Sequence, residues 1–424
     1  MNNTYTLRKL FNDVHLWLGL ASGLVLFVVC LSGTIYTFHT EVEEMLEPQK
    51  YQVKAQGQPI PINELVRQLE QELKGTVVGI DIPADKERTY RVSVAANGGE
   101  GKERSAPGAQ ATQQKPEAGR AGRGNAGPQG AQAGRGAHGG GRPTTYMVDP
   151  YTGEVKGTTE GPATKFFQTV MQLHRWLLIE GGVGKVIVGA ATIIFVFLTL
   201  TGLVLWFPLK RKNWKQGLKI KTNAKWKRVN HDLHNTLGFY SFLLLLIMAL
   251  TGLCWSFDWY REGVSSLMGD EVFKGRREKP LASPAPVAGA ATLQVSDYIA
   301  KANAILTGEG NLKVALPDND TTAVVVSKSA AGFFAFSAPD KVQLDQHTGQ
   351  ALKVEIFDEK PLNEQIVALV RPLHLGEVYG TFSKLLYFIA CLIATSLPVT
   401  GTLIWLNKLK KKPKNKRVAT QVAQ

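Results

Sequence analysis

The sequence contains little cysteine, and none of it lies in the long polar segments. Only three of the 424 residues are cysteines, and Cys30, Cys254 and Cys391 all lie in apolar stretches. This distribution excludes a disulfide framework in the polar segments, and it offers no grouped thiolates for a structural metal site.

Charge is absent from four long stretches of the chain. No Asp, Glu, Lys or Arg occurs in residues 14–40, 186–209, 233–257 or 385–407. Each stretch reaches the roughly 20 residues that a helix needs to cross a hydrocarbon core of about 30 Å. We therefore predict four membrane-spanning helices, and we expect the first to be retained because its apolar core is longer than that of a signal peptide. The missing intramembrane acids argue against a transporter with a binding site at mid-membrane.

Basic residues are concentrated in the short segments beside these spans. Residues 208–231 contain nine Lys or Arg and no acid, and the segment after Trp405 contains seven. Because such residues are retained in the cytoplasm, we expect cytoplasmic termini, a cytoplasmic central linker and two large outer loops. Nucleic-acid binding is not expected, since the basic runs adjoin spans and lack interleaved aromatic residues.

The second half of the chain repeats the first. The segment "DVHLWLGL" from Asp13 resembles "DLHNTLGF" from Asp232, and "LHRWLLIEGGVGK" from Leu173 resembles "LHLGEVYGTFSK" from Leu373. Each outer loop contains an amphipathic helical pattern, at 62–73 and at 295–306, followed by alternating strand patterns. We therefore expect an integral membrane α-helical fold of four transmembrane helices, built as a tandem duplication with two extracytoplasmic α+β domains.

These patterns also predict where each part of the chain begins and ends. An insert at 97–142, rich in Gly, Ala, Gln and Arg, is expected to be disordered because it has almost no large apolar residues to bury, and His138 within it carries little weight. The expected parts are 1–40 for the N-terminus and first span, 41–172 for the first outer domain, 173–209 for an outer histidine segment and the second span, 210–230 for the basic linker, 231–257 for the third span, 258–372 for the second outer domain, 373–407 for an outer histidine segment and the fourth span, and 408–424 for the basic tail.

Most of the histidines stand near the ends of the predicted spans. An ionisable side chain near hydrocarbon is costly enough to suggest function, and neutral imidazole is a common ligand of iron, zinc and copper. One such histidine alone would more often bond to headgroups or backbone, but the repetition favours a shared role. The inner-face residues are His15, His231 and His234, and the outer-face residues are His39, His174 and His374.

The repeat predicts two histidine pairs. A two-fold axis along the membrane normal would place His15 opposite His234 on the inner side and His174 opposite His374 on the outer side. Two facing histidines can ligate a haem iron on both faces. His231 shares a helical face with His234 and stays an alternative ligand. His39 is expected to lie at the membrane interface, and His347 is expected to have a structural role in a loop turn.

A small-residue pair recurs once in each predicted span. At 1.5 Å per residue, the 18 residues from His15 to Gly33 correspond to about 27 Å. The glycines of the first and third spans should therefore lie at the depth of the outer histidines. The glycines of the second and fourth spans should lie at the depth of the inner histidines. These glycines could make room for a porphyrin or serve plain helix packing. Chain breaks are expected at "EGGVG" and "GEVYG", because His174 and Gly202 are too far apart for one helix. The pairs are Ser32-Gly33, Thr201-Gly202, Thr251-Gly252 and Thr400-Gly401.

Together these motifs resemble the PepSY-associated transmembrane family, which includes iron-regulated inner-membrane proteins and ferric-siderophore reductases. The resemblance covers nearly the whole chain and rests on "HLWLGL" with "SGTIY", "LHRWL" with "TGLVLWFP", "HDLHNTLGFY" with "TGLCWSF", and "PLHLGEVYG" with "TGTLIW". It implies PepSY-like outer domains, a bacterial inner-membrane location and one-electron reduction of ferric siderophores on the periplasmic side. It also implies b-type haem, two per chain, held by His15, His234, His174 and His374.

The resemblance further implies partners. The substrate would be a ferric siderophore or another iron chelate, and no catalytic acid, base or nucleophile is expected. The electron donor would be a separate cytoplasmic flavin or NAD(P)H reductase or a quinol, since no dinucleotide fingerprint follows the last span. Arg175 and Arg371, next to the outer histidines, are expected to pair with haem propionates or to attract an anionic chelate. Two alternatives stay open: a non-enzymatic membrane-anchored PepSY binding or regulatory module, and a reductase of another metal such as copper.

Overall fold

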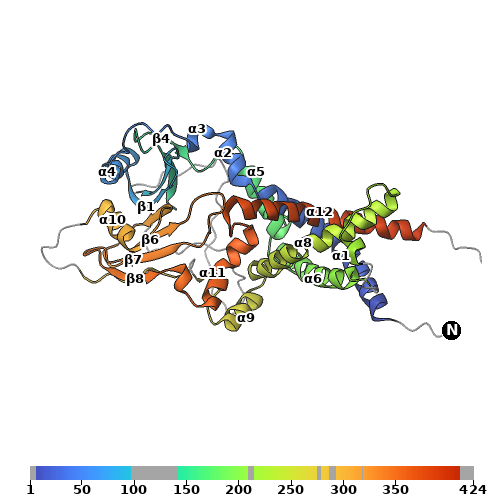
Figure 1. Ribbon diagram of the computed structural model, residues 1–424. Helices are drawn as coiled ribbons and strands as arrows, with labels where there is room; N and C mark the ends of the chain where they lie inside the picture. Colours follow the sequence, from blue (N-terminus) through green and yellow to red (C-terminus); the bar gives the residue numbers. More distant parts are fainter. Residues whose placement is uncertain are drawn as a thin grey trace, which may run out of the picture.

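The chain folds into a bundle of long helices joined to an α+β unit at one end of the bundle. In Figure 1 the α+β unit lies on the left and the bundle on the right. The computed structural model describes residues 6–96, 142–208, 214–274, 278–285, 293–317 and 319–410. The expected insert, apart from Arg142, and the tail beyond 410 lie outside the described residues, as does His138.

The four predicted spans are confirmed as long apolar helices. Within the described residues, four helices are long and apolar enough to cross a membrane. Their lengths of 24 to 31 residues correspond to about 36–46 Å, more than the hydrocarbon core requires. They are α1 (Leu7–Tyr36), α6 (Val183–Trp206), α8 (Trp226–Ser256) and α12 (Gly380–Leu409).

The bundle has a closed order of neighbours that decides which histidines can meet. Helix α1 packs on α6 and α12, and α8 packs on the same two helices, so α1 and α8 stand diagonally opposite each other. The middle of the bundle is filled by Leu245, Ala390 and Ala394. Helix α1 begins and α12 ends at the bundle end away from the α+β unit (Figure 1).

The two outer histidine segments are separate short helices, as the glycine-rich breaks predicted. Helix α5 (Thr164–Trp176) ends before a turn in which Gly181 and Gly182 have positive φ, and α6 then begins. Helix α11 (Leu362–Leu375) ends at Gly376, where φ is 74°. A Cβ at Gly376 would lie only 2.5 Å from the Tyr387 side chain, so both backbone conformation and space demand glycine there.

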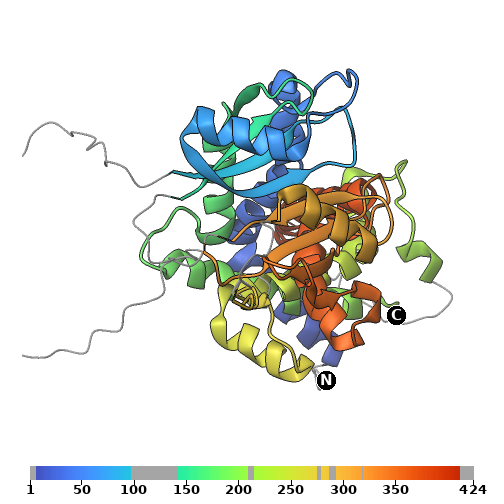
Figure 2. The same ribbon diagram turned by 90° about the vertical axis from the view of Figure 1, so that its left-hand side faces the viewer.

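The strands of both halves form one antiparallel sheet, in the order β4-β3-β2-β1-β5-β6-β7-β8. The two halves meet at β1 and β5, where Ile80 pairs with Val314, and Figure 2 shows the blue and orange halves side by side. The sequence predicted two α+β domains, and in the structure the strands of both belong to one sheet. The strands are β1 (Gly75–Ile82), β2 (Tyr90–Ala96), β3 (Thr144–Val148), β4 (Val155–Thr158), β5 (Asn311–Ala315), β6 (Val324–Ser329), β7 (Asp340–Leu344) and β8 (Ala351–Glu355).

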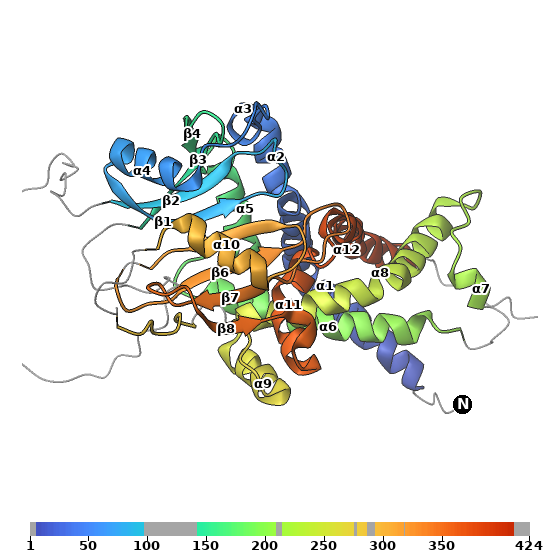
Figure 3. The same ribbon diagram turned by 60° about the vertical axis from the view of Figure 1, so that its left-hand side comes forward.

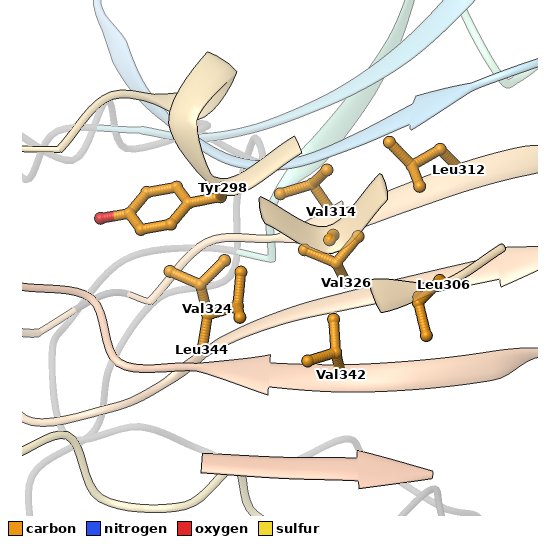
Figure 4. Packing of buried hydrophobic residues seen from close by; sticks show 9 residues of the cluster. Tyr298, Leu306, Leu312, Val314, Val324, Val326, Val342 and Leu344 are labelled. Carbon is orange, nitrogen blue, oxygen red and sulfur yellow. The ribbon is translucent and has the colours of Figure 1, made fainter. Parts of the chain in front are cut away.

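One face of the sheet is covered by a helix from each half, α4 (Ile62–Leu73) and α10 (Val295–Ile305) (Figure 3). Leu65 and Leu69 of α4 are fully buried on β1 and β2, each contributing about 1.5–3 kcal/mol. Tyr298 of α10 packs in the same way on the second half (Figure 4). The N-termini of the two helices meet, because Asn63 Nδ2 donates to Gln294 Oε1 at 2.6 Å.

Shorter helices connect the bundle to the sheet. Helix α2 (His39–Leu46) follows α1, and α9 (Asp258–Met268) follows α8 in the matching place. Lys384, in the first turns of α12, reaches Glu41 of α2 at 2.7 Å. The ends of the spans thereby extend directly into the α+β unit. The remaining short helices are α3 (Pro48–Tyr51) and α7 (Trp214–Gly217).

Candidate functional site

The two inner histidines face each other across the bundle. His15 lies on α1 and His234 on α8, the two diagonal helices, and their ring centres are 6.3 Å apart at an interplanar angle of 85°. An imidazole nitrogen bonds a metal at about 2.0–2.1 Å, so two imidazoles on opposite sides of one ion have ring centres about 6–6.5 Å apart. The separation of this pair fits one metal ion between them.

The two outer histidines form a second pair with the same spacing. His174 on α5 and His374 on α11 have ring centres 6.3 Å apart, at an angle of 57°. The Trp255 ring lies 5.0 Å from His374. Both pairings anticipated from the repeat are therefore present in the geometry, and the outer pair lies on the short helices outside the spans.

Each of the four histidines lies against one of the four repeated glycines. The depths expected from the spacing are correct, because the outer pair meets the glycines of α1 and α8 and the inner pair meets those of α6 and α12. The glycines lie directly against imidazole rings, whereas the sequence suggested either room for a porphyrin or plain helix packing. A Cβ would lie 3.1 Å from His174 at Gly33, 3.3 Å from His15 at Gly202, 2.9 Å from His374 at Gly252 and 3.2 Å from His234 at Gly401.

The hydroxyl before each glycine contacts Nδ1 of the same histidine. Each hydroxyl already donates its single proton to a helix carbonyl one turn back, so it can only accept from the ring. The contacts are His15 Nδ1 to Thr201 Oγ1 at 3.0 Å, His234 to Thr400 at 2.9 Å, His174 to Ser32 at 3.4 Å and His374 to Thr251 at 3.3 Å.

The outer pair makes a further and shorter bond to the backbone. His174 Nδ1 donates to the Val29 carbonyl at 2.8 Å, and His374 Nδ1 to the Met248 carbonyl at 2.9 Å. All four rings therefore carry their proton on Nδ1. The structure gives no hydrogen-bond partner to their Nε2 atoms within the described part of the chain. Nε2 is the nitrogen left for a metal, in the orientation that outer-shell bonds give metal-binding histidines.

A cavity of about 770 Å³ opens around the inner pair. Its volume lies within the range of cofactor sites, roughly 300–1,000 Å³. His15, His234, Gly202 and Gly401 line it together with apolar side chains of all four spans. Cations from the bundle end away from the sheet complete the lining, namely Arg8, Lys9, Arg228 and Lys408. The donor set, the spacing and this apolar cavity with a basic rim fit a haem with its propionates.

The other histidines occupy different surroundings. His231 lines the same cavity, but its side chain is 56% exposed and its Nδ1 lies 3.7 Å from Asp232. His39 stacks on Tyr36 with ring centres 4.0 Å apart, and its Nδ1 donates to the Tyr36 carbonyl. His347 contacts the Asp320 carbonyl in a loop of the α+β unit. Of the inner candidates, it is thus His234 whose ring faces His15.

Arg175 and Arg371 are both exposed and lie on the same helices as the outer histidines. The Arg175 guanidinium lies over the Trp176 ring at 5.2 Å.

Sequence reasoning missed the role of the hydroxyls and of the helix carbonyls. The signal was present, since Ser or Thr precedes Gly in all four spans. The pairs were interpreted as small residues that make room for a porphyrin or serve helix packing. Nothing in the spacing showed that a hydroxyl would accept a hydrogen bond from Nδ1. Sequence reasoning also did not place Trp255 beside His374, although the two rings lie close together.

The histidine pairs are the candidate metal ligands of the protein. Among the described residues, no group of three or more His, Cys, Asp or Glu side chains could hold a metal ion. Each pair would give a metal two protein ligands, which is the number that an iron held by two histidines in haem takes from the protein.

Comparison with protein families gives a match over almost the entire chain. The model of the PepSY-associated TM region matches residues 13–408, from before His15 to the end of α12. Comparison with curated proteins gives no match. The family match includes all four spans, both histidine pairs and the α+β unit between them. The chain therefore belongs to the PepSY-associated transmembrane family.

Proposed function

We propose that this protein is a transmembrane electron-transfer protein that binds two b-type haems and reduces a ferric chelate, such as a ferric siderophore, outside the cytoplasmic membrane of a bacterium. The observation that carries the proposal is the pair of facing histidines at each end of the bundle, both with ring centres 6.3 Å apart. Haem held by two such histidines would supply one-electron chemistry.

The residues around each pair hold the rings ready for a metal. The Nδ1 bonds fix the tautomer and the ring orientation, and the glycines allow the rings to lie directly against neighbouring helices. Because these supports belong to helices of the bundle, they would hold the four rings in a fixed orientation toward a bound metal. Arg8, Lys9, Arg228 and Lys408 would pair with propionates at the inner site. Arg175 and Arg371 are candidates for the same role, or for attracting an anionic chelate, at the outer site.

The arrangement supports transfer across the membrane. Helix α1 carries His15 near its start and Gly33, which contacts His174, near its end, a separation of about 27 Å along the helix. The basic segments favour a cytoplasmic location for the inner pair and both termini, and hence a periplasmic α+β unit. The matched order of elements in the two halves supports a tandem duplication with two PepSY-like domains. The donor would be a cytoplasmic flavin or NAD(P)H reductase or a quinol.

Reduction to Fe(II) would weaken the hold of hard oxygen ligands on iron and so release it. The proposal is tested in vesicles loaded with a reductant, with a ferric chelate and an Fe(II)-specific dye outside. Native protein should produce external Fe(II), whereas His15→Ala and His374→Ala should not. His231→Ala, which alters an exposed ring in the same cavity, should retain activity. A folded protein that binds no haem would indicate a binding or regulatory module instead, and turnover with Cu(II) but not with ferric chelates would assign a different metal.

A further inference from the structure

Three exposed phenylalanines form an aromatic patch beside the outer end of α12. Phe333 and Phe334 lie in the β6–β7 connection and Phe382 lies in the first turn of α12, with exposures of 51%, 66% and 40%. Their rings contact one another, at 4.8 Å between Phe333 and Phe334 and 5.0 Å between Phe334 and Phe382. Exposed aromatic clusters of this kind mark an interaction surface.

The connection is fastened to α12 by its backbone. The Phe382 amide donates to the Phe333 carbonyl at 3.1 Å, and the Ser337 amide donates to the Val378 carbonyl at 3.0 Å. Gly380, with φ of 54°, lets the two segments touch, since a Cβ there would lie 2.9 Å from the Gly332 carbonyl oxygen. The patch is therefore held in a fixed position at the start of a membrane span.

The patch continues the lipid-facing surface of that span. Phe382 is followed at helical spacing by Leu385, Leu386, Ile389 and Leu392, all between 42% and 47% exposed. A second segment connects this end of the sheet to the bundle. The end of β8 pairs with the start of β7, and the chain then continues into α11. The connection itself has no charge, since residues 329–339 contain no Asp, Glu, Lys or Arg.

We propose that Phe333 and Phe334 insert into the outer leaflet of the bilayer and anchor the α+β unit to the membrane surface. The occupant of the patch is lipid, because the patch is continuous with a surface that already faces lipid. Aromatic side chains are favoured at the boundary between headgroups and hydrocarbon. This anchor fixes how the sheet stands over the outer histidines, and it does not depend on haem being bound.

The test is a nitroxide spin label at Phe334→Cys, in nanodiscs that hold one copy of the protein. The matched control is Lys313→Cys, an exposed position on β5. Labelling the native chain gives the background from Cys30, Cys254 and Cys391, which are half-buried or buried. The label at 334 should collide more with oxygen than with a water-soluble nickel complex, and the label at 313 should do the opposite.

Two results would overturn the proposal. Nickel collisions at 334 as frequent as those at 313 would place the patch in water. In detergent, the label at 334 could be shielded from the nickel complex only at high protein concentration, with spin–spin broadening between copies. That result would assign the patch to contact with a second copy of the chain.

Discussion

Gly252 lies directly against the imidazole of His374, so close that a Cβ at position 252 would be 2.9 Å from the ring Cε1. Gly252→Ala should therefore displace His374 at a cost of about 1–3 kcal/mol and abolish haem binding at the outer site. The haem content per chain should fall by half. Gly263→Ala in α9 is the control, since a Cβ there would meet no other atom within 4 Å. An unchanged haem content in Gly252→Ala would refute the assignment of His374.

The hydroxyl of Thr400 accepts a hydrogen bond from Nδ1 of His234 at 2.9 Å. Thr400→Val keeps the shape of the side chain but removes this acceptor, and should weaken haem binding at the inner site about 10-fold. Thr400→Ser restores the hydroxyl and should recover most of the affinity. Haem titration of the two variants measures the difference, and equal affinities would mean that the hydroxyl does not position the ring.

The ion pair between Glu41 and Lys384 predicts an asymmetry between its two partners. The Lys384 side chain is 9% exposed and the Glu41 side chain 43% exposed. Glu41→Gln leaves a buried ammonium without its counter-charge and should cost about 1–3 kcal/mol. Lys384→Met removes the buried charge and should cost less. Thermal unfolding in detergent should rank the variants in this order, and the reverse order would mean that Lys384 is solvated.

Glu355 predicts an acid-dependent loss of stability in the α+β unit. Partial burial raises the pKa of Glu355, but hydrogen bonds from Lys353 and Lys360 outweigh it and lower the pKa from 4.5 to about 2. A carboxyl with a depressed pKa stabilises the fold above its unfolded pKa, so this contribution is lost as the pH falls from about 4.5 to about 2. Hydrogen exchange of β8 amides across this interval should show the loss.

The matched variant for this experiment is Glu355→Gln. It should be less stable than the native chain at neutral pH, and its exchange should change less between pH 4.5 and 2. Asp81→Asn is the control, because Asp81 pairs with Lys313 on the exposed surface. A native-like pH profile in Glu355→Gln would assign the acid sensitivity to another group.

Much of the architecture followed from the sequence because it depends on local patterns. The absence of charge located the spans, and the order of the four glycines and histidines gave the depth of each pair, since a helix converts residue number into distance. The helical patterns at 62–73 and 295–306 were also correct, and strands follow both helices as expected. These features need no knowledge of which elements meet in space.

The features that the sequence did not predict depend on contacts between distant residues. Pairing of β1 with β5 joins the two halves into one sheet, and nothing in either strand indicates a partner more than 200 residues away. The glycines were expected to make room for a porphyrin or to serve helix packing, whereas the structure shows the rings of histidines on other helices lying against them. Local sequence patterns also could not predict the tautomer of each ring, because a hydroxyl or carbonyl on a neighbouring helix sets it.

The haem content of the purified, full-length protein is the most direct test of the central claim. An absorption spectrum with quantified haem should show two b-type haems per chain, and His15→Ala or His374→Ala should each leave one. His231→Ala should retain both. A correctly folded native protein that remains colourless in the presence of haem would contradict the account.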